Sequence, residues 1–192
     1  MSSPRRPGTR ITAGLFRGLS LVMPPEIRAT ESKVRQALFN ILGESIRGAR
    51  VIDGFAGSGV LGIEAFSRGA AFVAFIEQDG TCVVSIRDNL ARLDPEPPSQ
   101  AWRVLHMDVV RGFHEVAASE PPFDVVLLDP PYRTDDGKKA LIALSQYAML
   151  APTSIVVIEH ERWTVLPLVS GPLHQRTQHR YGDTVLSFYQ LS

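Results

Sequence analysis

The chain has 192 residues, of which 44% are hydrophobic, and its 20 basic and 20 acidic residues give no net charge. A chain of this size can bury a substantial core, which excludes a disordered protein, and no apolar run reaches the roughly 18 residues of a membrane-spanning helix. The single cysteine, Cys82, excludes an internal disulfide and a zinc–cysteine cluster, so we expect a buried thiol and a cytoplasmic location.

The first 50 residues are basic although the whole chain is neutral. They contain nine Lys or Arg and three acidic residues, and they lack the apolar stretch of a secretory signal. Residues 10–13 and 19–22 have strand-like composition around Gly14 and Gly18, which predicts a small β-hairpin that displays Arg17. We expect this arm to meet a polyanion, with a solvated tail as the alternative.

A helix is predicted to start near Thr30. Val34, Leu38, Ile41 and Leu42 form an apolar stripe at helical spacing, which is typical of a helix that faces the core. We therefore expect this stripe to pack in the interior rather than to bind a partner.

A glycine-rich turn follows the apolar strand predicted over residues 50–54. Gly57, Gly59 and Gly62 have the spacing G-x-G-x-x-G, and Glu77 lies 20 residues after Gly57, as in dinucleotide-binding proteins. Taken alone, this spacing would predict a nicotinamide dinucleotide.

Asp53 argues against a dinucleotide. It ends the strand just before the turn, where its negative charge would oppose a pyrophosphate at the helix N-terminus. S-adenosylmethionine carries an ammonium and a sulfonium and has no phosphate, so the same charge would favour it. The sequence therefore predicts S-adenosylmethionine as the cofactor. Its candidate ligands at the strand end and turn are Asp53, Gly54, Phe55, Ala56, Gly57, Ser58 and Gly59.

Three further carboxylates stand at the ends of predicted strands. Glu77, Asp108 and Asp129 each follow a short apolar run. Because the carboxyl ends of parallel strands line one crevice, we expect these side chains to meet there. Glu77 would accept both ribose hydroxyls of the cofactor, and Asp108 would accept the adenine amine. Taken singly, Asp53, Glu77 or Asp108 could instead be a helix N-cap or a solvated strand end.

The run Asp129-Pro130-Pro131-Tyr132 combines a carboxylate, a stiff backbone and an aromatic ring. An exocyclic amine on a planar base is a poor nucleophile, because its lone pair is delocalised, and it needs acceptors that let the nitrogen pyramidalise. Asp129 can accept one N–H, and the Pro130 carbonyl can accept another, because two prolines prevent the turn from continuing as helix. With Tyr132 as a stacking surface, the run predicts chemistry on a base amine, against the alternative of a plain strand-ending loop.

Strands and helices alternate through the rest of the chain. A helix is predicted over residues 137–150 and a buried strand over 154–159. This alternation predicts an α/β fold in which a parallel sheet has helices on both faces. Two strand-like runs, 175–180 and 184–189, flank Gly182-Asp183 and predict a closing antiparallel hairpin.

Several short blocks match the pattern of one protein family. They are Arg10-Ile11 with Ala13-Gly14 and Arg17-Gly18, Arg28-Ala29-Thr30 with residues 34–42, residues 53–62, residues 129–132, and residues 181–184. On these blocks the chain resembles the class I S-adenosylmethionine-dependent methyltransferases and, within them, the RsmD family of bacterial 16S rRNA guanine-N2 methyltransferases. The arm departs from the family pattern at Leu19, Ala29 and Glu31-Ser32, whereas the Asp-Pro-Pro-Tyr turn follows it.

The resemblance implies a Rossmann-like fold with a mostly parallel seven-stranded sheet. It divides the chain into a basic arm with a β-hairpin, residues 1–29, and a class I methyltransferase domain, residues 30–192. It implies methyl transfer from S-adenosylmethionine to N2 of one guanine in 16S rRNA, free or in the assembled small subunit, with S-adenosylhomocysteine as product. The candidate phosphate contacts are Arg10, Arg17, Arg28 and Arg35. We expect a cytoplasmic monomer that needs neither a metal nor a membrane.

Two other functions stay open at this point. One is a DNA methyltransferase that acts on the amine of adenine or cytosine and uses a similar acidic-Pro-Pro-aromatic turn, although the chain has no room for a large target-recognition domain. The other is an RNA-binding assembly protein that keeps the fold without catalysis. Methyl transfer to RNA and to duplex DNA, with Asp129→Ala as the comparison, separates these functions.

Overall fold

The structure, a computed structural model, describes residues 9–24 and 32–192. Arg28, one of the predicted phosphate contacts, lies outside the described residues. The elements in chain order are α1 (Ser32–Leu42), η1 (Gly43–Ile46), β1 (Arg50–Gly54), α2 (Val60–Ser67), β2 (Phe72–Glu77), α3 (Gly80–Leu90), η2 (Ser99–Ala101), β3 (Trp102–His106), α4 (Val109–Ser119), β4 (Phe123–Leu128), α5 (Asp136–Leu144), β5 (Leu150–Glu161), β6 (Val169–Ser170), β7 (Leu173–Tyr181) and β8 (Thr184–Leu191).

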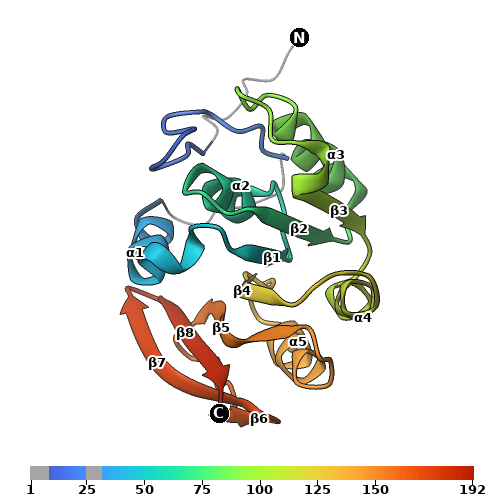
Figure 1. Cartoon of the computed structure of the whole chain (residues 1–192). Helices are drawn as coiled ribbons and strands as arrows, with labels where there is room; N and C mark the ends of the chain where they lie inside the picture. Colours follow the sequence, from blue (N-terminus) through green and yellow to red (C-terminus); the bar gives the residue numbers. More distant parts are fainter. Residues whose placement is uncertain (1–8, 25–31) are drawn as a thin grey trace.

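One mixed sheet organises the chain, with the strand order β3-β2-β1-β4-β5-β8-β7-β6 (Figure 1). The first five strands in this order are parallel, and β8, β7 and β6 are antiparallel to their neighbours. The predicted parallel sheet with a closing antiparallel hairpin is confirmed. The predicted number of seven strands is wrong, because the two-residue strand β6 pairs with the start of β7 and makes an eighth. A strand this short carries no periodicity that a sequence pattern could reveal.

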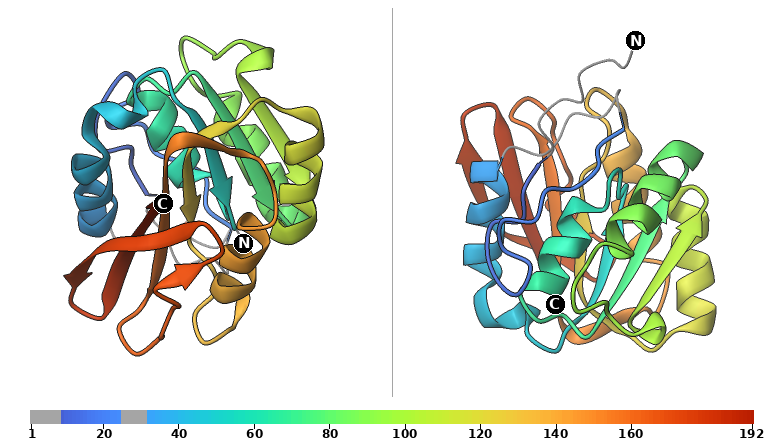
Figure 2. Two further views of the ribbon diagram at one scale, coloured as in Figure 1. Left: turned by 60° about the horizontal axis from the view of Figure 1, so that its bottom comes forward. Right: turned by 90° about the horizontal axis from the view of Figure 1, so that it is seen from above.

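Helices cover both faces of the sheet (Figure 2). Helices α1, α2 and α3 contribute to one apolar cluster, and α4 and α5 contribute to a second cluster on the other face. In α1, Val34, Leu38 and Leu42 are buried as predicted, whereas Ile41 is 40% exposed. No helix in either described range has the length and hydropathy to cross a lipid bilayer.

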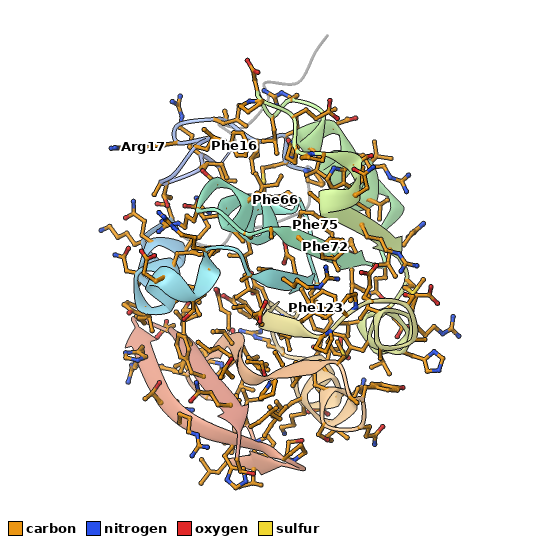
Figure 3. All side chains as sticks on the ribbon, viewed as in Figure 1. Phe16, Arg17, Phe66, Phe72, Phe75 and Phe123 are labelled. Carbon is orange, nitrogen blue, oxygen red and sulfur yellow. The ribbon has the colours of Figure 1, made fainter. Side chains whose placement is uncertain are left out.

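The predicted N-terminal hairpin is shorter than expected. In residues 9–24 a single antiparallel bridge joins Arg10 and Ser20, in place of two full strands. Phe16, at the tip, is buried, and Arg17 projects from the outer edge of the molecule (Figure 3). The hairpin therefore displays an arginine, as predicted, while an apolar neighbour anchors it.

The tip of the hairpin hydrogen-bonds to the C-terminal end of helix α2. The N–H of Leu15 donates to the carbonyl of Ser67 at 2.7 Å, and the N–H of Phe16 donates to the Ser67 hydroxyl at 2.9 Å. Gly14 has a φ of +82°, and a Cβ at this position would lie 1.7 Å from the Ser67 carbonyl oxygen. Only glycine allows the hairpin to approach the helix this closely.

A buried carboxylate on α2, that of Glu64, also holds the N-terminal hairpin. Glu64 is fully buried and accepts hydrogen bonds from the N–H groups of Thr12 and Ala13 and from the Thr12 hydroxyl. It also forms ion pairs with Arg35 at 3.4 Å and with Arg68 at 2.9 Å. Because a buried charge is stable only when it is paired and hydrogen-bonded, this network ties the hairpin, α1 and α2 together.

Candidate active site

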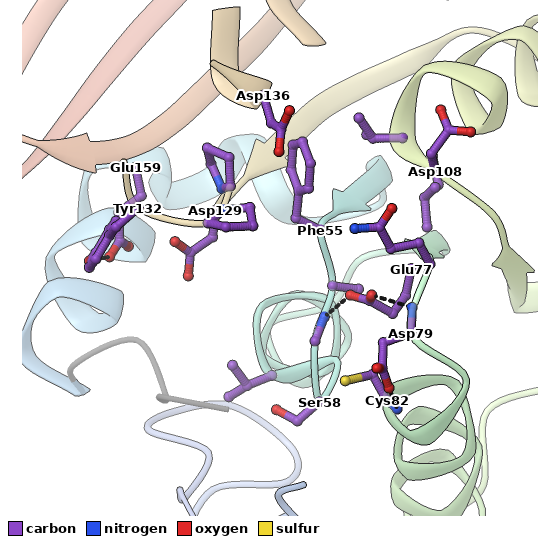
Figure 4. Close-up of a pocket in the computed structure, with 18 of the residues that line it drawn as sticks. Phe55, Ser58, Glu77, Asp79, Cys82, Asp108, Asp129, Tyr132, Asp136 and Glu159 are labelled. Atoms are coloured by element: carbon purple, nitrogen blue, oxygen red, sulfur yellow. Dashed lines mark hydrogen bonds between the residues drawn. The ribbon is translucent and has the colours of Figure 1, made fainter. Parts of the chain in front are cut away.

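The carboxyl ends of the parallel strands open into a cleft of about 1260 Å³. Residues that follow β1, β2, β3, β4 and β5 line it, and the turn between β7 and β8 closes one side. Glu77, Asp79 and Asp108 lie on one side of the cleft, and Asp129 and Tyr132 lie on the other (Figure 4). The structure thus brings the predicted strand-end carboxylates Glu77, Asp108 and Asp129 into one cavity.

The glycine turn between β1 and α2 depends on backbone conformations that favour glycine. Gly57 and Gly59 have φ values of 54° and 78°. A Cβ on Gly62 would lie 2.2 Å from the ring of Phe75, so glycine also lets α2 pack closely on β2. Of the predicted cofactor ligands in this segment, Phe55, Ala56, Gly57 and Ser58 line the cleft, whereas Gly54 and Gly59 are buried behind it.

Asp53 holds the turn instead of facing the cleft. Its side chain is 1% exposed, and it accepts a hydrogen bond from the N–H of Gly62 at 2.8 Å. Burial raises the pKa of Asp53 well above its ordinary value, partly offset by this hydrogen bond and reinforced by the charges of Asp129 and Glu77. The prediction of Asp53 as a cofactor ligand is therefore corrected, because this side chain does not line the cleft. The hydrogen bond to Asp53 occupies the N–H of Gly62 in the first turn of α2. A pyrophosphate bound at this helix N-terminus would need such free N–H groups, so the bond still argues against a dinucleotide.

Glu77 is fixed at the edge of the cleft by two backbone donors. Its carboxylate accepts from the N–H of Gly57 at 2.7 Å and from the N–H of Asp79 at 2.8 Å. Asp108 caps α4 by accepting from the N–H of Arg111 at 3.1 Å, which is the N-cap alternative considered above. Because each carboxylate oxygen has two lone pairs, both side chains keep acceptor capacity toward the cleft that they line.

The charge of the cleft is strongly negative. Among the described residues that line it, one is basic, Lys139, and this residue is paired with Asp136 at 3.0 Å. Eight are acidic: Glu77, Asp79, Asp108, Asp129, Asp136, Glu159, Glu161 and Asp183. Such a site attracts a cation and repels a pyrophosphate or an RNA phosphate.

Cys82 also lines the cleft and is buried, as predicted for the single thiol. Burial raises its pKa to about 12, and the negative charges of Glu77 and Asp79 act in the same direction. Since the thiolate is the reactive form of cysteine, this thiol stays protonated and is a poor nucleophile at neutral pH.

The Asp-Pro-Pro-Tyr turn stands directly after β4 and faces the cleft. Pro130 is buried against α5, where a Cβ on Gly137 would lie 3.2 Å from its Cγ. Tyr132 is 40% exposed, and its hydroxyl donates to Glu159 at 3.2 Å. Burial, followed by the charge of Glu159, raises the pKa of Tyr132 to about 12, so this side chain remains a neutral donor. The turn therefore offers a carboxylate, a fixed backbone and an aromatic face to one ligand.

The N-terminal segment supplies part of the wall, which the sequence did not indicate. Met23 and Pro24 line the cleft just after Val22. The buried side chain of Asn89 on α3 accepts from the N–H of Val22 at 2.7 Å and donates to its carbonyl at 3.0 Å. It also donates to the carbonyl of Ser58 at 3.1 Å. Asn89 thus joins the segment that ends at Pro24 to the glycine turn.

The arginines predicted to bind phosphate fall into different environments. Arg10 and Arg17 are exposed near the hairpin, and Arg28 lies outside the described residues. Arg35 is fully buried; besides Glu64 it donates to the Thr9 hydroxyl and to the carbonyl of Arg10. Its predicted phosphate contact is therefore corrected, because a side chain with no exposed surface cannot reach RNA.

Comparisons with known proteins agree with this geometry. A family model described as "Conserved hypothetical protein 95" matches residues 9–190. The chain is 35% identical to "Putative rRNA methyltransferase YlbH" of Bacillus subtilis, over 94% of this chain and 98% of the relative. It is 32% identical to "Ribosomal RNA small subunit methyltransferase D" of Escherichia coli, over 99% of this chain and 95% of the relative. The chain belongs to the RsmD family.

Solved structures show the same fold. A structure named "Putative methyltransferase yhhF from Escherichia coli" is 31% identical, with a TM-score of 0.82 over 96% of this chain and 98% of that one. A more distant structure, a putative methyltransferase complexed with SAH, is 14% identical with a TM-score of 0.64 and shares the fold alone. This RsmD family member therefore has a methyltransferase-like fold.

Proposed function

We propose that this protein is an S-adenosylmethionine-dependent methyltransferase that modifies N2 of one guanine in 16S rRNA. The observation that carries the proposal is the shared cleft, in which the Asp129–Tyr132 turn faces the same cavity as the glycine turn and Glu77. The named relatives, described as rRNA methyltransferases, support RNA as the substrate.

The cofactor half of the cleft fits S-adenosylmethionine by its charge and by its anchored acceptors. Glu77, held by Gly57 and Asp79, would accept the ribose hydroxyls, and Asp108 would accept the adenine amine. The surrounding carboxylates would favour the ammonium and the sulfonium. When bound, the cofactor supplies an electrophilic methyl group, and the residues of the chain orient the acceptor.

Asp129 and Pro130 would act on the amine of the substrate. The carboxylate of Asp129 accepts one N–H and the carbonyl of Pro130 accepts the other, which frees the nitrogen lone pair for in-line attack on the methyl carbon. The nitrogen would form the new N–C bond as S-adenosylhomocysteine leaves with the electron pair of the methyl–sulfur bond, and the extra proton of the nitrogen would pass to Asp129 or to water. Most of the acceleration would come from this placement.

The guanine would have to leave its stack to enter the cleft, at a cost of a few kcal/mol that stacking on Tyr132 offsets. Because the cleft is acidic, the phosphates of the RNA would stay outside it. Arg10 and Arg17 on the exposed side of the arm are the described residues that we propose for these phosphates. We keep the division into an arm, residues 1–29, and a catalytic domain, residues 30–192, as part of this proposal.

Tritiated-methyl transfer tests the proposal. Wild-type protein should label 16S rRNA from cells that lack the corresponding modification and should leave duplex DNA unlabelled. Asp129→Ala should lower the rate by about 10²–10⁴-fold while S-adenosylhomocysteine still binds. Asp88→Ala, which removes an exposed aspartate of α3, is the matched control. Equal labelling by wild type and Asp129→Ala would remove the enzymatic role, and labelling of DNA alone would favour the DNA methyltransferase.

A further inference from the structure

The cleft extends beyond Asp129, away from the proposed cofactor ligands Glu77 and Asp108. Residues at the end of β5 and in the turn between β7 and β8 line this part, together with Tyr132. They are Glu159, Glu161, Trp163, Tyr181, Gly182, Asp183 and Thr184. Arg162 pairs with Asp183 at 3.1 Å but does not line the cleft. The aromatic rings and carboxylates that do line this region suit an uncharged base that presents hydrogen-bond donors.

Glu159 is the most enclosed acidic side chain of this region. It is 4% exposed, yet it lines the cleft, and it accepts from the Tyr132 hydroxyl at 3.2 Å. In the register of the parallel strands β4 and β5, Leu128 pairs with Ile158, so Asp129 and Glu159 directly follow paired residues. Neighbouring strands lie about 4.8 Å apart, so the backbones of Asp129 and Glu159 stand side by side at the carboxyl ends of β4 and β5. Figure 4 shows both on the same side of the cleft as Tyr132.

Two neighbouring acceptors of this kind suit one edge of one base. In guanine, the ring nitrogen N1 next to the exocyclic N2 amine carries a hydrogen, so adjacent donors face outward. In adenine and cytosine, the ring nitrogen next to the exocyclic amine has a lone pair and no hydrogen. A buried carboxylate beside the amine site would therefore accept from guanine and repel the other two bases.

We propose that Glu159 is a specificity residue of the base subsite and accepts the N1–H of the guanine whose N2 amine faces Asp129. This inference rests on the proposed function and adds the group that selects guanine. Tyr132 would serve twice, since its ring stacks on the base and its hydroxyl holds the Glu159 carboxylate. Unpaired buried polar groups are the means by which enzymes reject close analogues most strongly.

The test uses 2-aminopurine, which keeps the exocyclic amine at position 2 but has an unprotonated N1. RNA prepared by ligation would carry either guanine or 2-aminopurine at the position that the wild-type protein methylates. Wild type should prefer guanine by about 100-fold or more in kcat/KM. Glu159→Gln replaces the carboxylate by an amide, which can donate to an unprotonated N1, so the preference should fall to about tenfold or less.

The ratio of the two substrates separates recognition from a merely structural role. If Glu159 only holds Tyr132, then Glu159→Gln and Tyr132→Phe should lower both rates alike and leave the ratio at its wild-type value. Glu159→Asp keeps the charge and should keep a preference for guanine. Glu44→Gln, which changes an exposed carboxylate of η1, should leave both rates unchanged. The affinity for the two RNAs in the presence of S-adenosylhomocysteine gives the same ratio for a variant that does not turn over.

The outcomes distinguish this inference from the proposed function. A wild-type ratio retained in Glu159→Gln, in rate or in affinity, overturns the role of Glu159 while guanine methylation stands. Absence of transfer to the guanine RNA by the wild type overturns the proposed function and this inference with it. The assignment is supported if the preference for guanine over 2-aminopurine falls in Glu159→Gln and is retained in Tyr132→Phe, Glu159→Asp and Glu44→Gln.

Discussion

Replacing Arg35 by methionine should destabilise the protein without a specific effect on RNA binding. Arg35 has no exposed surface, and its guanidinium contacts Glu64, the Thr9 hydroxyl and the Arg10 carbonyl. Burial lowers the pKa of Arg35, and the charge of Glu64 opposes this effect. The attraction between the two charges offsets the unfavourable burial of each. Removal of Arg35 therefore leaves the buried carboxylate of Glu64 with one ion pair fewer.

The expected loss in the free energy of unfolding is about 3 kcal/mol. Breaking a buried ion pair by removing one partner costs about 3–5 kcal/mol, and the lower end applies because Glu64 keeps Arg68 and the donors of Thr12 and Ala13. For a chain of this size, the change corresponds to a fall of roughly 6–12 °C in Tm.

Urea unfolding and RNA binding measured on two variants test this reasoning. Arg35→Met should lower the unfolding midpoint, whereas Arg17→Met, the same change at an exposed position, should shift stability by less than about 0.5 kcal/mol. Below the unfolding transition, Arg35→Met should bind RNA with the salt dependence of the wild type. Unchanged stability of Arg35→Met, combined with a shallower salt dependence, would refute the burial argument and restore Arg35 as a phosphate contact.

Three further predictions follow from the site. Arg17→Ala should weaken binding of 16S rRNA and reduce the slope of log affinity against log salt by about 1, with kcat retained; an unaltered slope would exclude Arg17 from the RNA interface. Asn89→Ala should raise KM for S-adenosylmethionine more than it lowers kcat, because the cleft wall at Met23 loses its anchor, whereas the exposed control Asn40→Ala should change neither. Because burial raises the pKa of Asp53, the folded protein keeps a proton that the unfolded chain loses above pH 3.8. As pH rises above 3.8, the unfolding free energy of the wild type should therefore fall relative to that of Asp53→Asn. Parallel pH profiles of the two proteins would contradict the raised pKa of Asp53.

The parallel sheet and the cleft could be predicted because both depend on local patterns. Apolar runs that end in a carboxylate identify the strand ends, and parallel topology brings these ends together without further information. Glu77, Asp108 and Asp129 line the cleft for this reason. The same signal was present at Glu159, which also closes an apolar strand, so its place in the cleft could have been inferred.

The positions of Asp53 and Arg35 could not be predicted in the same way. Side chains alternate between the faces of a strand, and whether Asp53 meets the cleft or α2 depends on how the glycine turn folds back. Arg35 lies next to the apolar stripe of α1, and its partner Glu64 is on another helix. A pairing between helices leaves no trace in the periodicity of either one, so the basic segment alone predicts a phosphate contact for Arg35.

The most direct test of the central claim is mass spectrometry of nucleosides from 16S rRNA of a strain that lacks this gene. We predict the loss of one N2-methylguanosine, restored by the wild-type gene and not by Asp129→Ala. Retention of every N2-methylguanosine in the deletion strain, or the loss of a methylated adenosine or cytidine instead, would contradict it.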